Sequence, residues 1–513
     1  MRDDAQHSRR SFIRAASVGA GALAVGFDVT SRAWAAESPQ GTGGTGGTGG
    51  AGRATGAAGA GADFRRVPHL DGRLLIDPAD LKPYEDDYGH LVHRTPRAAL
   101  LPGSVRDVAA MIAFCGPLGI PVAPRGQGHQ AYGQAQVDGG LIIDLGPLDS
   151  IAVDSRANTA TVGAGAVWSA VLTASLAHGL TPPVFTDYIE LSIGGTLSAG
   201  GLGGASQQHG AQVDNVLELQ VVTGTGETRT CSRTRDADLF HAALSGLGQV
   251  GVITRAVLKL VAAPTSVRSY TLVYPTVAAL TAAQRVAVGD GRFDWLEGTI
   301  LPDGSGGWLY LLNGSAFYDA TPPDDNALIG DLGYVGPAQI QDSPYQAFVD
   351  DLAPTVAALK ASGEWYDPHP WFNGFLPDAA TDALAAAALA ATTPADLGAS
   401  GLVLLYPVPT EKLTTPLLSV PDSDLAFLFA VLRTAAPDGG ALPAPELVQA
   451  NRDLYLQVQA AGGTQYPVGA IPMTAADWRK QYGARWRTFR AAKQRFDPFG
   501  ILAPGQGIFG PSH

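Results

Sequence analysis

The sequence predicts a protein of the α+β class with two folded domains. Strands and helices alternate between residues 104 and 261, and beyond Pro264 the pattern loosens into strand-like pieces and Ala-rich helices. The chain has 513 residues, of which 46% are hydrophobic, so it can bury a large core. We therefore expect a domain boundary near residue 265.

Composition narrows the classes of function. The formal net charge is -13, from 47 acidic and 34 basic side chains, which argues against nucleic acid or an anionic membrane as the main partner. Only two cysteines occur, Cys115 and Cys231, so thiolates cannot build a zinc or iron–sulfur site, although one disulfide is possible. No metal site is predicted, and small molecules are the expected partners.

The first 63 residues predict export rather than a fold. Paired arginines in S-R-R-S-F-I-R (residues 8–14), a short apolar stretch and A-W-A (residues 33–35) match a twin-arginine signal peptide over 1–36. A disordered basic N-terminus is the alternative. Residues 37–63, rich in Gly, Thr and Ala, read as a flexible tether. No later run of 18 apolar residues occurs, so we expect a secreted or cell-envelope protein without a membrane anchor after cleavage.

The first predicted domain begins with a helix over 104–115, capped by Ser104 with Asp107 and stopped by Gly116-Pro117. A second helix, 167–178, ends at Gly179. The remaining elements before the boundary are strands at 120–123, 141–145, 151–153 and 160–162, two strands within 216–230, a helix at 238–245 and a strand at 252–261.

Beyond the boundary, strands are predicted at 270–274 and 402–406, and a helix at 378–391. The last helix is expected to start at Thr474, with Asp477 as its capping partner, and to end before Pro498. Its buried face would carry Trp478, Tyr482, Trp486 and Phe489.

Two stretches match the dinucleotide pattern G-x-G-x-x-G/A, at residues 126–131 and 246–251. That pattern binds a pyrophosphate only between a strand and the N-terminus of a helix. No helical pattern follows the first stretch, and the second leads from a helix into a strand, so we reject a Rossmann NAD site. Glycines around 126–128 would still let consecutive N–H groups approach an anion closely.

Five stretches together resemble one family. The stretch R-G-Q-G-H-Q-A-Y-G-Q-A (residues 125–135) resembles the flavin-attachment loop of FAD-linked oxidases of the vanillyl-alcohol-oxidase type. The further stretches are F-T-D-Y (185–188) leading into G-G-T-L-S-A-G-G (194–201), F-D-W-L-E-G (293–298), H-P-W-F-N-G-F-L-P (369–377) and F-D-P-F-G-I-L-A-P-G-Q-G-I-F (496–509). In this order they resemble cytokinin dehydrogenase (cytokinin oxidase), over about residues 90 to 510.

The resemblance implies a fold and a division of the sequence. It implies an FAD-binding domain of the PCMH type, built of two α/β subdomains, over 64–265. A substrate-binding domain, with an antiparallel sheet flanked by helices, would follow over 266–465. Residues 466–513 would return to the FAD domain.

The resemblance also implies a site. His129 stands where the family bonds the 8α carbon of FAD covalently, and Asp187 matches the catalytic aspartate, which deprotonates the substrate amine while hydride passes to flavin N5. Glu297 matches an acidic residue near the substrate entrance, and Trp371 and Phe372 are candidates for the substrate site. The further implied FAD contacts are Gly126, Gln127, Gly128, Gln130, Gln134, Asp187, Ser192, Ser198, Leu202, Ile253, Tyr466, Ala503 and Gln506.

Each residue also has an ordinary interpretation. His129 would be a packing or turn histidine, Asp187 a turn or helix cap, Glu297 a solvated loop carboxylate, and the aromatic pair and the FAD contacts turn or core positions. Two positions depart from the family pattern, which usually has Ser at Gln130 and Trp at Phe185. These changes put in doubt the hydrogen bonding at the flavin and the shape of the substrate pocket.

The sequence thus favours an exported oxidoreductase with covalent FAD that oxidises cytokinins, which are N6-substituted adenines. The reaction would cleave the C–N bond between the adenine and its side group, giving adenine and an aldehyde. Oxygen or a quinone-like compound would then accept the electrons. An alcohol or sugar oxidase on the same fold is the first alternative, and a non-catalytic exported ligand-binding protein is the second.

Overall fold

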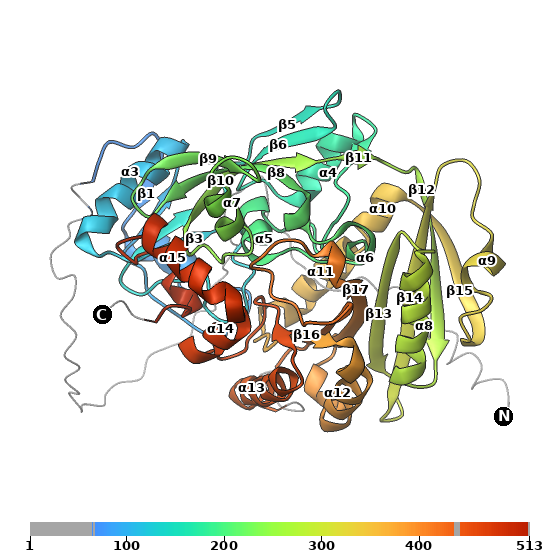
Figure 1. Ribbon diagram of the computed structural model, residues 1–513. Helices are drawn as coiled ribbons and strands as arrows, with labels where there is room; N and C mark the ends of the chain where they lie inside the picture. Colours follow the sequence, from blue (N-terminus) through green and yellow to red (C-terminus); the bar gives the residue numbers. More distant parts are fainter. Residues whose placement is uncertain (1–63, 65–66, 436–441, 511–513) are drawn as a thin grey trace.

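A computed structural model describes residue 64, residues 67–435 and residues 442–510. The predicted signal peptide and tether lie outside this described part. Within it the protein is a mixed assembly of helices and sheets, with both small and large antiparallel sheets (Figure 1). The predicted α+β class, with an antiparallel sheet flanked by helices, is confirmed.

A four-stranded sheet comes first, with the order β1-β2-β4-β3. Strands β2, β4 and β3 run parallel to one another, and β1 runs antiparallel to β2. The elements are β1 (Arg73–Leu75), β2 (Ala98–Leu101), β3 (Val122–Arg125), β4 (Leu141–Asp144), and the helices α2 (Pro78–Leu81) and α3 (Val105–Cys115). Helix α3 buries Val108, Met111, Ile112 and Cys115, as its amphipathic pattern predicts.

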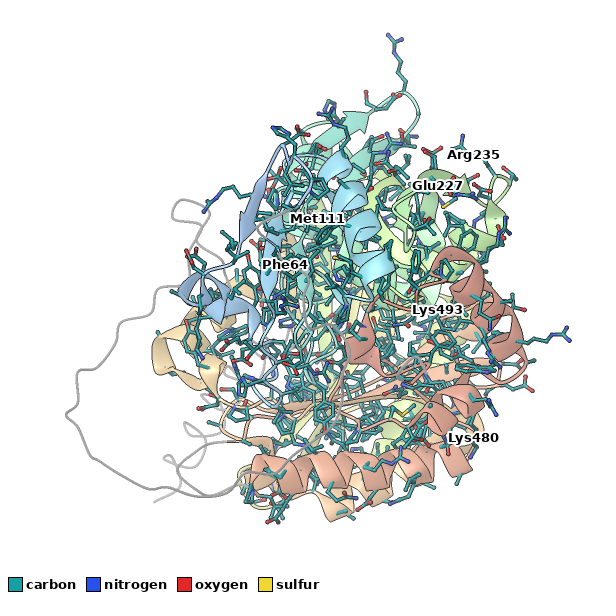
Figure 2. The ribbon with its side chains drawn as sticks, turned by 90° about the vertical axis from the view of Figure 1, so that its left-hand side faces the viewer. Phe64, Met111, Glu227, Arg235, Lys480 and Lys493 are labelled. Atoms are coloured by element: carbon teal, nitrogen blue, oxygen red, sulfur yellow. The ribbon has the colours of Figure 1, made fainter. Side chains whose placement is uncertain are left out.

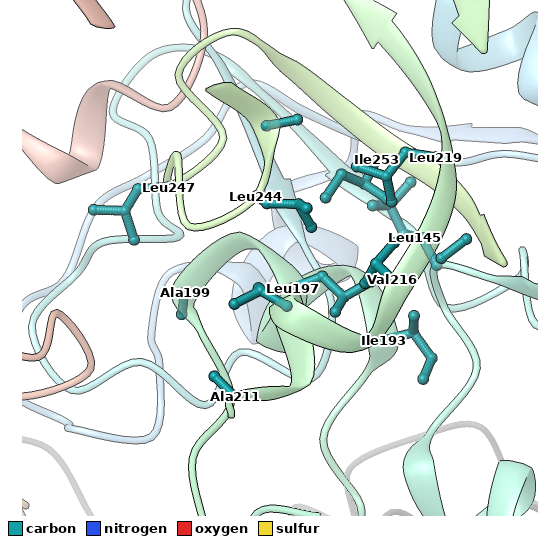
Figure 3. Close-up of a cluster of buried hydrophobic side chains, with 14 of the residues drawn as sticks. Leu145, Ile193, Leu197, Ala199, Ala211, Val216, Leu219, Leu244, Leu247 and Ile253 are labelled. Atoms are coloured by element: carbon teal, nitrogen blue, oxygen red, sulfur yellow. The ribbon is translucent and has the colours of Figure 1, made fainter. Parts of the chain in front are cut away.

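A five-stranded antiparallel sheet follows, with the order β5-β6-β10-β8-β9. Its strands are β5 (Ile151–Asp154), β6 (Thr159–Gly163), β8 (Val216–Thr223), β9 (Thr228–Ser232) and β10 (Gly251–Lys259). The intervening elements are α4 (Trp168–Leu176), β7 (Leu180–Thr181), α5 (Ile193–Ala199), α6 (Ser206–His209), α7 (Ala237–Ala243) and β11 (Val261–Ala262). Figure 3 shows Ile193 and Leu197 of α5 in the same buried cluster as Leu219 of β8 and Ile253 of β10.

The largest sheet has eight strands in the order β15-β12-β14-β13-β17-β18-β16-β19. They are β12 (Ser266–Tyr274), β13 (Trp295–Pro302), β14 (Trp308–Tyr318), β15 (Val335–Pro344), β16 (Phe372–Pro377), β17 (Leu402–Pro409), β18 (Leu425–Leu432) and β19 (Thr464–Gln465). The associated helices are α8 (Val277–Asp290), α9 (Asp325–Ile329), α10 (Tyr345–Val349), α11 (Ala353–Ser362), α12 (Asp378–Ala391) and α13 (Ala444–Ala460). Buried residues of α8, α12 and α13 join one hydrophobic cluster with this sheet.

The C-terminal segment packs on the first part of the protein. Its helices are α14 (Ala475–Tyr482) and α15 (Trp486–Phe496), and α15 contacts α7. Beyond them Leu502 bridges to Val122 of β3. In Figure 2 Lys493 lies on this segment, where its Nζ pairs with Asp497 Oδ2 at 2.7 Å. The C-terminal segment is therefore fixed beside the first sheet.

Two local predictions at helix ends had different outcomes. At α14 the capping box is confirmed, because Thr474 Oγ1 accepts from Asp477 N and Asp477 Oδ2 accepts from Thr474 N. At α3 it is wrong: Ser104 Oγ donates to Asp71, and the Asp107 carboxylate accepts from the backbone of Gly103. Asp107 ties α3 to a neighbouring loop instead.

The single long C-terminal helix is also wrong. A 3-10 turn, Gly483–Arg485, separates α14 from α15, and Gly483 has a φ of 49° that favours glycine. Tyr482 and Phe489 are buried as predicted, whereas Trp486 is half-buried. Cys115 and Cys231 are both buried and free, so they form no disulfide. Within the described ranges no helix is long and apolar enough to cross a membrane.

Candidate active site

A large cleft is lined by four separate segments of the described part of the protein. They are the loop after β3, the segment around α5, the turn before β10, and the C-terminal stretch with Tyr466 and Gln506. The cleft holds about 980 Å³ of space, including its open mouth. We call it the long cleft. Segments distant in sequence meet there because the C-terminal part folds back against β3.

The long cleft gathers most of the residues that the sequence predicted for FAD. The twelve that line it are Gly126, Gln127, Gly128, His129, Gln130, Gln134, Ser192, Ser198, Ile253, Tyr466, Ala503 and Gln506. Leu202 is buried and does not line it, and neither do Asp187 and Glu297. The predicted contacts therefore form one surface, apart from Leu202 and the two proposed catalytic carboxylates.

Sequence reasoning missed one wall of the long cleft. Leu247, Gly248 and Gly251 line it, and they belong to the second glycine pattern, which we set aside as a nucleotide motif. As predicted, that pattern leads from a helix, α7, into a strand, β10. The glycine spacing alone was the available signal, because it marks a place where the backbone comes close to a ligand.

The loop over residues 126–131 faces the long cleft with main-chain donors. Two of its carbonyl groups accept hydrogen bonds from the segment at 88–89: Tyr88 N donates to Gly128 O at 3.0 Å, and Gly89 N donates to Gln130 O at 3.1 Å. Among the described residues none of the backbone N–H groups of 126–131 donates a hydrogen bond. Residues 126–130 line the cleft and their N–H groups have no partner within the described part of the protein, so the loop is suited to hold an acceptor-rich ligand.

Close packing holds this loop in place. A Cβ added to Gly126 would lie 1.9 Å from Ser192 Oγ, and one on Gly128 would lie 2.4 Å from the Arg125 guanidinium. Gly128 also has a φ of 67°, which side chains rarely adopt. The buried Asp87 carboxylate accepts from Gly133 N at 2.6 Å, and burial raises the pKa of Asp87 to about 7.

The residues present fit a flavin dinucleotide. The cleft offers unpaired main-chain donors, glycine walls, and two amide oxygens, Gln130 Oε1 and Gln506 Oε1, that are buried without a partner among the described residues. Tyr466 Oη is engaged, because it accepts from Gly201 N at 2.9 Å. A long ligand with a polar isoalloxazine edge would satisfy such groups.

His129 stands among aromatic rings. Its centroid is 4.1 Å from that of Tyr88, 5.0 Å from Tyr188 and 5.9 Å from Trp371. Burial lowers the pKa of His129 to about 3, so its imidazole is neutral at neutral pH and keeps a nitrogen lone pair. A neutral imidazole that lines the cleft can act as a nucleophile.

The smaller cavity adjoins the long cleft, since Thr186 lines both. We call it the aromatic cavity, and it holds about 530 Å³ of space, including its open mouth. Its lining residues are Pro183, Phe185, Thr186, Asp187, Ala205, Trp295, Phe317, Tyr345, Phe348, Val349 and Asp351. Asp187 follows Thr186 in the sequence and lines only the aromatic cavity.

Asp187 and Glu297 form a coupled pair. Burial raises the pKa of Asp187 to about 6, and its interaction with Glu297 lowers it in part. Burial and then the charge of Asp187 raise the pKa of Glu297 well above its usual range. Two carboxyls placed together do not both ionise readily, so near pH 7 Asp187 carries the charge and Glu297 the proton.

The structure corrects the expected position of Glu297. The resemblance implies a place near the substrate entrance, and the ordinary interpretation is a solvated loop carboxylate, but Glu297 lies in β13, is 0% exposed, and lines neither cavity. Its carboxyl interacts with that of Asp187 and with the backbone of Gly204. Glu297 can therefore act on a ligand only through Asp187.

The two aromatic candidates for the substrate site line neither cavity. Phe372 is 0% exposed and belongs to the core beside the large sheet. Trp371 is buried and packs with Tyr88 and His129, behind the loop of the long cleft. Both rings therefore pack in the interior of the protein rather than against either cavity. Among the described residues no group of three or more His, Cys, Asp or Glu side chains could hold a metal ion.

Known families match two parts of the sequence. An FAD-binding-domain family matches residues 96–232, and the family described as cytokinin dehydrogenase 1, FAD and cytokinin binding, matches residues 302–509. The first match includes the loop after β3 and α5. The second includes β16 and the C-terminal residues of the long cleft.

Similar proteins align over most of the sequence. The uncharacterised oxidoreductase ORF5 of the fasciation locus of Rhodococcoides fascians is 40% identical over 82% of this chain and 95% of that protein. Cytokinin dehydrogenase 5 of rice (Oryza sativa subsp. japonica) is 36% identical over 85% of this chain and 91% of that protein. Rice cytokinin dehydrogenase 10 is 34% identical over 82% and 86%, respectively.

Solved structures share the fold at low identity. 6-Hydroxy-D-nicotine oxidase from Arthrobacter nicotinovorans superposes with a TM-score of 0.65 at 19% identity, over 86% of this chain and 99% of that protein. A chitooligosaccharide oxidase superposes with a TM-score of 0.67 at 18% identity, over 87% and 98%. The fold is that of the vanillyl-alcohol-oxidase type of flavoprotein.

Proposed function

The protein belongs to the cytokinin dehydrogenase family of FAD-linked oxidoreductases, and we propose that it uses a covalently bound flavin to oxidise N6-substituted adenines at the C–N bond of the N6 substituent. One observation carries the choice of reaction. Asp187, an ionisable carboxylate paired with a buried Glu297, lines a cavity that meets the long cleft at Thr186. This is the arrangement that a general base beside a redox cofactor requires.

In this proposal the long cleft holds FAD. The main-chain N–H groups of 126–131 would bind its acceptor atoms, and Ser192, Ile253, Tyr466 and Gln506 would line its remaining length. His129 would carry the covalent bond to the flavin, because its ring lines the cleft and burial keeps it neutral. When bound, the flavin supplies the acceptor for the hydride of the substrate.

Asp187 would act as the base. Its carboxylate accepts the proton of the substrate amine as the C–H bond beside that nitrogen is broken, which leaves a C=N bond in the substrate. Protonated Glu297 would keep Asp187 ionised and in position. Water would then hydrolyse the imine to adenine and an aldehyde, and oxygen or a quinone-like compound would take up the electrons.

The shape of the aromatic cavity favours an N6-substituted adenine over the alternatives. Phe185, Trp295 and Phe348 give it flat apolar walls, which suit a planar ring better than an alditol or a sugar. Asp187 and Glu297 have different, raised pKa values, which is typical of catalytic sites. This favours an enzyme over a non-catalytic ligand-binding protein. Export by the twin-arginine route, which accepts folded proteins, would suit an enzyme that acquires its flavin inside the cell.

An anaerobic titration tests the function. We expect N6-isopentenyladenine to bleach the flavin absorbance of the purified protein, and alditols and sugars to leave it unchanged. Bleaching by an alditol or a sugar alone would favour the alcohol or sugar oxidase. A protein that is colourless, or that no small substrate bleaches, would favour the ligand-binding alternative.

A further inference from the structure

The surface of α14 and α15 concentrates positive charge. Residues 479–495 contain seven basic side chains and no acidic one, although the net charge of the whole chain is -13. Lys493 is buried, and the other six are exposed. We call these six the basic face: Arg479, Lys480, Arg485, Arg487, Arg490 and Arg495. A surface whose charge is opposite in sign to that of the whole chain can bind an anionic partner.

The amphipathic pattern of α15 explains why the arginines point to solvent. The helix buries Phe489, Ala492 and Phe496, so Arg487 and Arg490 lie on its other side, three residues apart. Like charges at this spacing on a helix repel each other. Among the described residues no hydrogen bond or ion pair involves the side chains of Arg485, Arg487 and Arg490. Their charge is therefore available to a partner.

The acidic residues beside the basic face already have partners. Asp238 of α7 pairs with Arg495 at the end of α15. The buried Asp497 pairs with Lys493. Asp477 is occupied at the start of α14, where its carboxylate accepts from Thr474. The charge of the three unpaired arginines is thus not neutralised by these neighbours.

Two exposed apolar side chains lie at the end of this surface. Phe499, just after α15, is 43% exposed, and Leu118, just after α3, is 45% exposed. They are neighbours, because the Phe499 ring covers Gly116, where an added Cβ would lie 2.6 Å from it. Helices α3, α14 and α15 share one side of the molecule (Figure 1), and Figure 2 looks onto that side. Basic residues beside exposed apolar ones are typical of a surface that binds a lipid bilayer, whereas a soluble polyanion needs only the charge.

We propose that this side of the protein binds the surface of a bilayer that contains anionic phospholipids. The arginines of the basic face would meet the phosphate headgroups, and Phe499 and Leu118 would enter the interface between headgroups and acyl chains. The negative charge of the whole chain does not oppose this contact, because salt screens charges beyond about 8 Å under physiological conditions. The contact is peripheral, since no helix in the described ranges could cross a membrane.

Co-sedimentation with vesicles tests the proposal in the full-length, flavin-loaded protein. We expect the wild type to bind vesicles of equal parts phosphatidylglycerol and phosphatidylcholine more tightly than vesicles of phosphatidylcholine alone. The triple variant Arg485→Gln, Arg487→Gln and Arg490→Gln should bind the anionic vesicles roughly 10²-fold more weakly, with an unchanged melting temperature. Both proteins share residues 1–63, so any lipid binding by the predicted signal peptide is the same in each. Phe499→Ser should weaken binding by a smaller factor that salt does not change.

A second triple variant, Arg156→Gln, Lys259→Gln and Lys412→Gln, is the matched control. It removes the same charge from positions outside α3, α14 and α15, and it should bind as the wild type does. An arginine variant that binds like the wild type, or a control variant that loses as much affinity, would overturn the proposal. Binding of the wild type to soluble heparin but not to vesicles would assign the basic face to a soluble polyanion and overturn it as well.

Discussion

The long cleft and the aromatic cavity meet at Thr186 but are built from different kinds of groups. The long cleft combines six glycines and the unpaired N–H groups of 126–131 with amide, hydroxyl and apolar side chains. Its one buried cation, Arg125, donates to the carbonyls of Asp86 and Pro83 outside the cleft. The aromatic cavity is made of side chains, with four rings in contact and two carboxylates.

This difference separates binding from chemistry. Backbone donors have no titrating group, so the long cleft should hold the same cofactor over a wide pH range, and only changes of shape should disturb it. The carboxylates of the aromatic cavity change charge near pH 6 to 7, so substitutions there should change reaction and selectivity.

His129→Ala should have the largest effect, because it should abolish the covalent attachment of the flavin completely. Flavin fluorescence should stay with the acid-precipitated wild-type polypeptide and be absent from the precipitated variant. The native variant should still bind FAD reversibly, because the unpaired N–H groups of 126–131 remain. His369→Gln is the matched control: this histidine packs on Tyr88 at 4.2 Å but does not line the cleft.

A colourless wild-type precipitate would refute the covalent bond. A His129→Ala protein that binds no flavin at all, with a normal melting temperature, would show that a side chain rather than the backbone dominates binding. That second outcome would contradict the view that the long cleft binds through its backbone and the aromatic cavity acts through its side chains.

Asp187→Asn should slow anaerobic flavin reduction by roughly 10²–10⁴-fold, the usual contribution of a general base. Asn has the same shape but cannot accept the proton, so flavin content should stay near the wild-type level. Glu297→Gln should cost less, because the amide can still donate to Asp187. Equal losses of reduction rate and flavin content in Asp187→Asn would make Asp187 a structural residue.

The sequence could predict the long cleft better than the aromatic cavity for a physical reason. A backbone-built site needs glycines at fixed spacing, and such patterns are visible in one sequence: twelve predicted residues line the cleft. Even there, Leu247 and Gly248 were missed, because their pattern was judged only as a nucleotide motif. Leu202 was carried over by resemblance and is core.

The aromatic cavity is assembled from side chains more than 150 residues apart, Asp187 and Asp351 among them. No local pattern marks Asp351, which follows another aspartate at the end of a short helix. The same limit explains Glu297: its sequence neighbours do not reveal that β13 carries it into the core against Asp187. Helix pattern alone likewise missed the break at Gly483, since amphipathic spacing continues across it.

The smallest expected effect is on pH dependence: the rate of flavin reduction should change with pH, whereas the flavin content should not. Burial raises the pKa of Asp187 to about 6, so the active carboxylate is lost as the pH falls through that value. The second-order rate constant of flavin reduction should be about tenfold lower at pH 5 than on its plateau above pH 7. Flavin content should stay constant over the same range, because the donors of the long cleft do not titrate.

The measurement belongs in Asp351→Asn protein, since Asp351 has a pKa of about 7 and titrates in the same range. In that background Glu297→Leu should move the midpoint upward, because the interaction with Glu297 is what lowers the pKa of Asp187. Glu297→Gln should leave the midpoint near 6, because its amide N–H still stabilises the ionised form. A midpoint that neither change moves would assign the titration to a group outside the carboxylate pair.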